Sequence, residues 1–131
     1  MSASPERAEN GVEIDHGQTE GELEIDPELL AEWLARDPSL QVIDVRETYE
    51  REAGHIEGTR HIGLVELSGQ AGNLQRDHPV VFYCRVGTRS LMAAQAFRAA
   101  GFQAHSMRGG LLRWVQEGRP LNPPDGHVAE H

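Results

Sequence analysis

Short apolar segments alternate with helical segments along this chain, and this alternation constrains its fold more than any other feature. Residues 40–45 (LQVIDV) and 79–84 (PVVFYC) are rich in β-branched and aromatic side chains, as expected of strands buried on both faces of a sheet. Residues 102–107 (FQAHSM) form a weaker third segment of this kind. Strands that alternate with helices predict an α/β fold, with a mainly parallel sheet and helices on both faces.

The helical segments between these strands have recognisable ends. The first helix is expected to start after Asp26, a favourable N-cap residue, and to stop before Pro38. The clearest helix covers residues 89–100 and is followed by Gly101, a typical C′ residue. Weaker helical patterns cover residues 47–54, 65–74 and 111–118, and in the last of these Leu111, Leu112 and Val115 are expected to form the buried side.

The negative charge of the chain is concentrated at its N-terminal end. The chain has 131 residues, enough for one hydrophobic core, and a net charge of −9. Nine of its 21 acids but one of its 12 bases lie within residues 1–28, so the rest of the chain is almost neutral. We therefore predict an acidic disordered leader over residues 1–22, a folded domain over 23–121 and a C-terminal tail over 122–131. This distribution argues against nucleic acid or an anionic membrane as a partner.

The sequence lacks the patterns typical of membrane spans, secretion signals and metal sites. No apolar run approaches the ~20 residues that cross a bilayer, and the start MSASPERAEN has no basic segment followed by an apolar one. We therefore expect a cytoplasmic protein. The single cysteine excludes an internal disulfide and a multi-thiolate zinc site, and the seven histidines have no compact ligand spacing. We expect no metal and no cofactor.

The one cysteine lies where a predicted strand meets a predicted helix. In VVFYCRVGTRSLMAA, Cys84 ends the strand and the helix begins a few residues later, so the positive end of the helix is expected to face the sulfur. Arg85, Arg89 and a loop made possible by Gly87 add to a positive potential that favours the thiolate. A lone cysteine is more often a small buried side chain than a nucleophile, but this strand, loop and helix context favours the nucleophile.

Three segments together resemble the rhodanese-like domains, a family of single-domain sulfurtransferases. They are VIDVRETYEREAGHIEGTRHI, CRVGTRS and MRGGLLRWVQEGRPL, and their order and spacing match the family over residues 23–121. The segment GTRHIG (58–63) departs from the family's frequent Gly-Ala-x-Asn-Ile-Pro, which affects a loop away from the cysteine. The resemblance implies a parallel sheet of about five strands. It also implies that Cys84 is the sulfur-carrying nucleophile, cradled by the backbone amides of Arg85, Val86, Gly87, Thr88, Arg89 and Ser90.

The length of the loop after Cys84 distinguishes sulfurtransferases from the related phosphatases. Four residues lie between Cys84 and Arg89, whereas the related cell-cycle phosphatases have five residues before the arginine and a larger loop that fits phosphate. The shorter loop resembles the sulfurtransferase form, and its two arginines suit thiosulfate. A phosphatase or arsenate reductase is disfavoured by this loop and by the lack of a second, resolving cysteine.

The reaction that the resemblance implies is a ping-pong transfer from thiosulfate to a thiophilic acceptor. The Cys84 thiolate attacks the outer sulfur, sulfite leaves, and cyanide, a thiol or a protein thiol removes the sulfur from the persulfide. Arg85 and Arg89 are expected to position the sulfonate group. The alternative hypothesis is a carrier or regulatory domain that delivers persulfide sulfur to a protein partner.

Asp44 and Arg46 end the neighbouring predicted strand and are the candidate supporting residues. They can brace the loop through an ion pair, or Asp44 can cap the following turn, and the sequence leaves both interpretations open. His55 is expected to be buried and hydrogen-bonded rather than a general base. The pair Gly109 and Gly110 is expected to permit a close backbone approach behind the cysteine loop.

Overall fold

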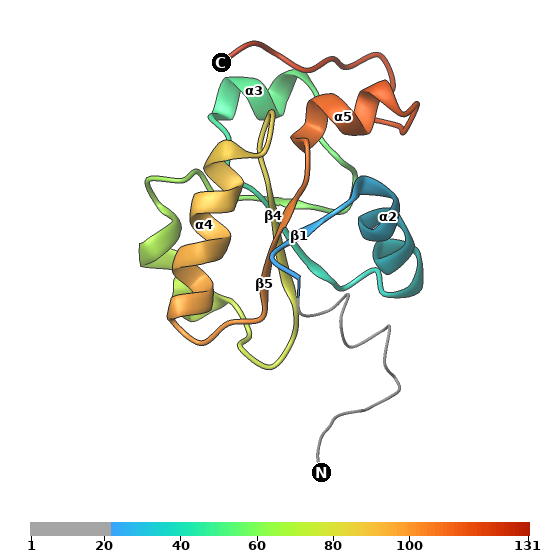
Figure 1. Cartoon of the computed structure of the whole chain (residues 1–131). Coiled ribbons are helices and arrows are strands. Elements are labelled where there is room, and N and C mark those ends of the chain that lie inside the picture. Colours follow the sequence, from blue (N-terminus) through green and yellow to red (C-terminus); the bar gives the residue numbers. More distant parts are fainter. Residues whose placement is uncertain (1–21) are drawn as a thin grey trace.

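A five-stranded parallel sheet forms the centre of the fold (Figure 1). The computed structural model describes residues 22–131, so residues 1–21 of the predicted acidic leader lie outside the described residues. All neighbouring strands pair in parallel, which confirms the predicted α/β class. Across the sheet the strands are β1 (Glu24–Ile25), β5 (Ala104–Met107), β4 (Val80–Tyr83), β2 (Gln41–Asp44) and β3 (Arg60–His61).

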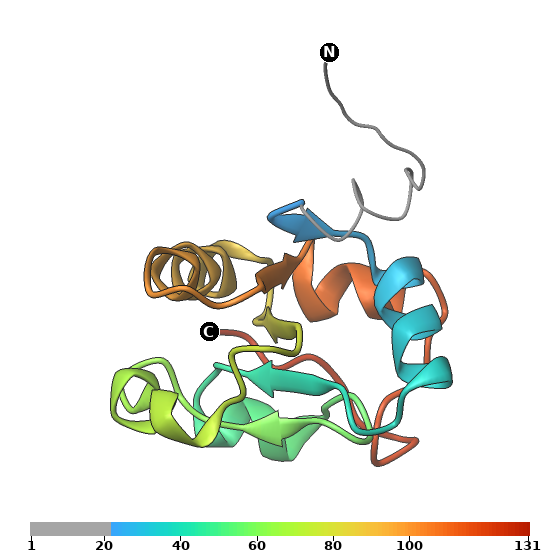
Figure 2. The ribbon, with the colours of Figure 1, turned by 90° about the horizontal axis from the view of Figure 1, so that it is seen from below.

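Helices cover both faces of the sheet, as Figures 1 and 2 show from two directions. Helix α4 (Thr88–Ala99) and the 3₁₀ helix η2 (Leu67–Asn73) lie on one face, and α2 (Pro27–Arg36) and α5 (Gly110–Gln116) lie on the other. Helix α3 (Thr48–Ala53) follows β2 at the end of the sheet where the strands finish. No helix within residues 22–131 is both long and apolar enough to cross a membrane.

Alternate residues of β4 enter two separate hydrophobic clusters. Val80 and Phe82 pack with Cys84 in the cluster beneath α4, whereas Val81 and Tyr83 join the cluster beneath α2 and α5. All five side chains are at most 1% exposed. Because the strand is buried on both faces, its sequence is a continuous apolar run rather than an alternating one.

The prediction that Val115 lies on the buried side of the last helix is wrong. Leu111 and Trp114 face the core in α5, whereas Val115 is 37% exposed and Leu112 is half-buried. Positions three apart share one side of a helix, and the indole N–H of Trp114 also donates to the Pro120 carbonyl at 2.8 Å. The aromatic side chain therefore defines the packed side.

Asp26 precedes α2 as predicted, but its carboxylate does not cap the helix. Its Oδ1 instead accepts hydrogen bonds from Arg108 at 2.9 Å and from Arg113 at 3.3 Å. These two cations follow β5 and lie in α5, so the carboxylate connects the start of α2 to the other end of the chain. Tertiary ion pairing replaces the local cap here.

The segment 122–131 returns from α5 to α3 and packs against it (Figure 1, red). Asn122 and His55 exchange two backbone hydrogen bonds of 2.8 and 3.1 Å in an antiparallel bridge. The His127 amide then donates to the Ala53 carbonyl at 2.9 Å, and Val128 packs against the cluster beneath α2 and α5. We call this segment, residues 122–131, the C-terminal strap.

Candidate active site

Cys84 lies immediately after the central strand β4 and faces the start of α4. Gly87 is the N-cap residue of α4 and has a φ of 104°, a left-handed conformation that glycine adopts without the steric cost of a Cβ. This conformation lets the chain reverse from strand to helix within three residues of the cysteine. The Leu111 amide donates to the Cys84 carbonyl at 2.8 Å, so α5 holds the loop from behind.

The sulfur of Cys84 accepts hydrogen bonds from two backbone amides of its loop. The N–H groups of Gly87 and Ser90 donate to Sγ at 3.1 and 3.4 Å. The sequence predicted that six loop amides, from Arg85 to Ser90, surround the sulfur. Within residues 22–131, these two amides donate hydrogen bonds to Sγ. Amides directed at Sγ, together with the N-terminus of a 12-residue helix, stabilise negative charge on the sulfur.

The hydroxyl of Ser90 connects the sulfur to the neighbouring strand. The Cys84 thiol donates to Ser90 Oγ at 3.5 Å, and Ser90 Oγ lies 2.7 Å from Ser106 Oγ in β5. Ser106 was not among the residues predicted from the sequence, although a serine inside an otherwise buried strand is an unusual feature that signals a hydrogen-bonded role.

Cys84 opens into a cavity of about 380 Å³. The residue itself is only 1% exposed, so a reagent reaches the sulfur through this cavity. The loop contributes most of the walls, and one further residue, His131, comes from the C-terminal strap. The lining residues are Cys84, Arg85, Val86, Thr88, Arg89 and His131.

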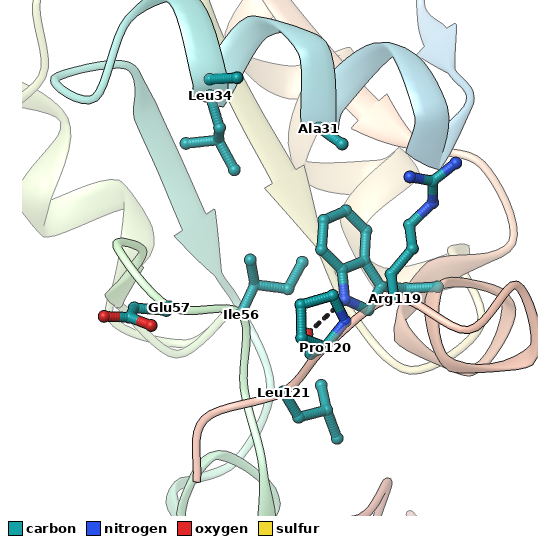
Figure 3. A pocket seen from close by; sticks show the side chains of 9 residues that line it. Ala31, Leu34, Ile56, Glu57, Arg119, Pro120 and Leu121 are labelled. Atoms are coloured by element: carbon teal, nitrogen blue, oxygen red, sulfur yellow. Dashed lines mark hydrogen bonds between the residues drawn. The ribbon is translucent and has the colours of Figure 1, made fainter. Parts of the chain in front are cut away.

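A larger and more apolar cavity of about 420 Å³ lies elsewhere, between α2 and the segment that follows α5 (Figure 3). Leu34, Ile56 and Leu121 lie around it together with Trp114, whose indole N–H donates to the Pro120 carbonyl. None of the predicted site residues lines this cavity. The predicted site residues of the cysteine loop line the smaller cavity at Cys84 instead.

The two arginines of the loop have different partners. The guanidinium of Arg89 donates in a fork to both carboxylate oxygens of Glu50, at 2.9 and 3.0 Å. The side chain of Arg85 forms no hydrogen bond or ion pair within residues 22–131, and its Nε is buried without a partner. Both arginines were predicted to position the sulfonate, but of the two only Arg85 lacks an anionic partner among residues 22–131.

Glu50 lies next to the cysteine loop and was not predicted from the sequence as a site residue. It is 0% exposed, and its carboxylate also accepts the Glu47 amide at 2.9 Å in a capping box at the start of α3. The acidic residue three positions after Glu47 signals that box. Nothing in the sequence indicates that the same carboxylate binds Arg89, 39 residues later.

Replacement of Glu50 by glutamine is expected to remove a pH-dependent contribution to stability. Burial alone raises the pKa of Glu50, but the hydrogen bonds from Arg89 and the charge of that guanidinium hold this pKa below the ordinary value. A lowered folded-state pKa means that the stabilisation is complete above about pH 4.3, the ordinary glutamate pKa, and is lost as the pH falls through the folded-state pKa. Glu50→Gln should lower the free energy of unfolding by about 2 kcal/mol at pH 7.

Urea unfolding of both proteins between pH 7 and pH 3 measures this effect. The difference between wild type and Glu50→Gln should shrink as the pH falls, because protonated Glu50 also lacks its charge. A difference that stays constant across this range would contradict the assignment of the ion pair.

Asp44 caps the following turn, which is one of the two interpretations left open by the sequence, and it also forms the ion pair with Arg46. The Asp44 carboxylate accepts the Arg46 backbone amide at 3.1 Å, which caps the turn, and accepts the guanidinium of the same residue at 2.7 and 2.8 Å. Arg46 also donates to the Gly54 carbonyl at 2.8 Å, and Arg51 approaches Asp44 at 3.5 Å. The pair therefore joins the end of β2 to α3, rather than contacting the cysteine loop directly.

His55 does not line the Cys84 cavity. Its Nδ1 lies 3.2 Å from the Arg51 carbonyl, which confirms the expected hydrogen bond, but the residue is half-buried rather than buried. Within residues 22–131, no group of three or more His, Cys, Asp or Glu side chains is arranged to hold a metal ion.

Gly110 confirms the expected close approach behind the cysteine loop. A Cβ built on this residue would lie 2.6 Å from the Val86 nitrogen and still closer to the Arg85 carbonyl, and its φ of 66° also disfavours a side chain. The approach lets the Leu112 amide donate to the Arg85 carbonyl at 3.0 Å. The turn after β5 thus supports the loop that follows Cys84.

Comparison with known proteins agrees with this geometry. The family model of the rhodanese-like domain matches residues 26–117. The chain is 30% identical over 104 residues to a sulfurtransferase of Allochromatium vinosum, a match that covers 79% of this chain and 97% of that protein. It is 45% identical over 75 residues to a tRNA sulfurtransferase of Desulfurococcus amylolyticus, where the match covers 56% of this chain and only 14% of the longer protein.

A solved structure shows the same fold. The rhodanese-related protein of Thermoplasma volcanium superposes with a TM-score of 0.70 at 29% identity, covering 76% of this chain and 97% of that one. Relatives named as sulfurtransferases support a sulfurtransferase role. The family match, which spans every helix and strand from α2 to α5, shows that this chain belongs to the rhodanese-like domain family.

Proposed function

We propose that this chain is a thiosulfate:acceptor sulfurtransferase that carries sulfane sulfur as a persulfide on Cys84. The observation that carries the proposal is the position of the sulfur, which accepts hydrogen bonds from two amides at the start of α4. It lies beside Arg85, whose side chain has no partner within the described residues 22–131. This arrangement stabilises an anion on or next to the sulfur before any substrate arrives. We also propose a cytoplasmic location, where reduced thiol acceptors are abundant.

The first half-reaction breaks the S–S bond of thiosulfate. The Cys84 thiolate attacks the outer sulfur, a new S–S bond forms, and sulfite leaves with the electron pair of the broken bond, so that thiolate and thiosulfate become persulfide anion and sulfite. The guanidinium of Arg85 binds the sulfonate oxygens through charge-assisted hydrogen bonds. The amides of Gly87 and Ser90 then stabilise the persulfide anion.

The second half-reaction regenerates the thiolate. Cyanide or an external thiolate attacks the terminal sulfur, which leaves as thiocyanate or as a new persulfide, and Cys84 recovers the electron pair. Because Cys84 is the one cysteine of the chain, this attack comes from another molecule. The alternative proposal, delivery to a protein partner, uses the same chemistry with a protein thiol as the acceptor.

Intact-mass measurement tests the proposal directly. Brief exposure to thiosulfate should add one sulfur, about 32 Da, and cyanide or a thiol should remove it. A parallel sample with an aryl phosphate should show no hydrolysis, because the loop of four intervening residues is short. Hydrolysis of the aryl phosphate, without a sulfur adduct from thiosulfate, would reject the sulfurtransferase in favour of a phosphatase.

Arg85→Gln is expected to weaken thiosulfate binding more than it slows the chemical step. Loss of a charge-assisted contact to the sulfonate should raise KM for thiosulfate about 10- to 100-fold, with a smaller change in kcat. Arg60→Gln, at an exposed position in β3, is the matched control and should leave both constants unchanged. Steady-state thiocyanate formation measures both constants, and an unchanged KM for Arg85→Gln would contradict the assigned role.

A further inference from the structure

One wall of the Cys84 cavity is formed by a residue outside the cysteine loop. His131 lines the cavity together with Cys84, Arg85 and Arg89, although it lies 47 positions after the cysteine. The strap brings it there by crossing α3, and Figure 1 shows the C-terminal end of the chain beside this helix. The family match ends at residue 117, so the strap lies beyond the part of the fold that the family model describes.

Hydrogen bonds at three points hold the strap on α3 and on His55, two residues after the helix. The bridge between Asn122 and His55 fixes its start, and the hydrogen bond from His127 to Ala53 fixes its middle. Close to the cavity, the Tyr49 hydroxyl donates to the Glu130 carbonyl at 3.1 Å. The residue next to His131 is therefore fastened to the same helix that supplies Glu50, the partner of Arg89.

Two glycines make this close packing possible. A Cβ on Gly54 would lie 2.7 Å from the His127 carbonyl oxygen, and a Cβ on Gly126 would lie 2.7 Å from the Ala53 carbonyl oxygen. Contacts this short are not tolerated, so each position needs a residue without a side chain. The backbone of the strap and the backbone at the end of α3 are thus in direct contact at both glycines.

We propose that the C-terminal strap is a specificity element of the active site, in which His131 limits the size of the sulfur donor or acceptor that reaches Cys84. The proposal rests on the sulfurtransferase function proposed above for the choice of substrates. The cavity of about 380 Å³ is large enough for thiosulfate. Because His131 lines it, a donor that carries an aryl group in place of one sulfonate oxygen is expected to meet this residue. The expected preference is for small inorganic donors over aryl thiosulfonates.

Two substitutions of opposite size test the proposal at an exposed position, where both variants should fold. His131→Ala should raise the ratio of kcat/KM for benzenethiosulfonate to kcat/KM for thiosulfate about tenfold, and His131→Trp should lower it. His127→Ala and His127→Trp are the matched controls, since this exposed histidine lies on the same strap but does not line the cavity. Tyr49→Phe, which removes the anchor to Glu130, should raise the ratio in the same direction as His131→Ala.

Alkylation of Cys84 separates this proposal from the proposed function. The rate constant for alkylation by an N-aryl iodoacetamide, divided by the rate constant for iodoacetamide, measures the space around the sulfur and requires no sulfur transfer. This alkylation ratio should rise in His131→Ala and fall in His131→Trp, even if thiosulfate proves not to be a donor. Ratios that match those of the His127 variants, in both alkylation and sulfur transfer, would overturn the strap as a specificity element.

Discussion

Cys84→Ser is expected to abolish both the sulfur adduct and the transfer of sulfur to cyanide. A serine hydroxyl is a much weaker nucleophile than a thiolate at neutral pH, and the chain has no other thiol. Thiocyanate formation should fall by at least about 1,000-fold, and thiosulfate should leave the mass of the variant unchanged. Intact-mass spectrometry and a cyanide-dependent assay measure the two effects on the same samples.

The fold of Cys84→Ser should remain close to that of the wild type. The Gly87 amide that contacts Sγ can donate to a serine oxygen, and Ser90 can still accept its proton. The free energy of unfolding should therefore change by no more than about 1.5 kcal/mol. A variant that unfolds at room temperature would make the loss of activity uninformative, and Cys84→Ala then provides the second variant. A sulfur adduct on either folded variant would place the nucleophile elsewhere.

Asp44→Ala is expected to cause the largest loss of stability of any single ionic substitution in the described part of the chain. Asp44 and Arg46 are both 0% exposed, and removal of the carboxylate leaves a guanidinium that stays charged at any accessible pH. Breaking a buried pair by removing one partner costs about 3–5 kcal/mol. The remaining contact of Arg46 with the Gly54 carbonyl does not neutralise the charge.

Asp77→Ala is the matched control for this prediction. Asp77 Oδ1 also has a hydrogen-bond partner, His78 Nδ1 at 2.8 Å, but the Asp77 side chain is 83% exposed. An exposed pair contributes about 0–1 kcal/mol, so this variant should unfold at nearly the wild-type urea concentration. Equal losses in Asp44→Ala and Asp77→Ala would show that the buried pair does not hold β2 and α3 together.

The elements found from sequence are those with local signals. The apolar runs at β2 and β4, and the helix that ends before Gly101, were predicted because a buried strand or helix needs such residues over four or more positions. Strands β1 and β3 were not located by this pattern, since each has two residues and no periodicity to detect. The weak helix expected over residues 65–74 is a 3₁₀ helix over Leu67–Asn73, which contains two glycines.

The sequence by itself determined the α/β class and the position of Cys84 between a strand, a glycine-containing loop and a helix start, because both depend on contiguous residues. Only the tertiary structure decided which charged side chains near the sulfur form ion pairs. It pairs Arg89 with the buried Glu50, gives Arg85 no side-chain partner among residues 22–131, and brings His131 to the cavity from 47 positions after the cysteine. Those contacts join residues about 40 or more positions apart, and sequence spacing carries no information about which distant side chains the fold brings together.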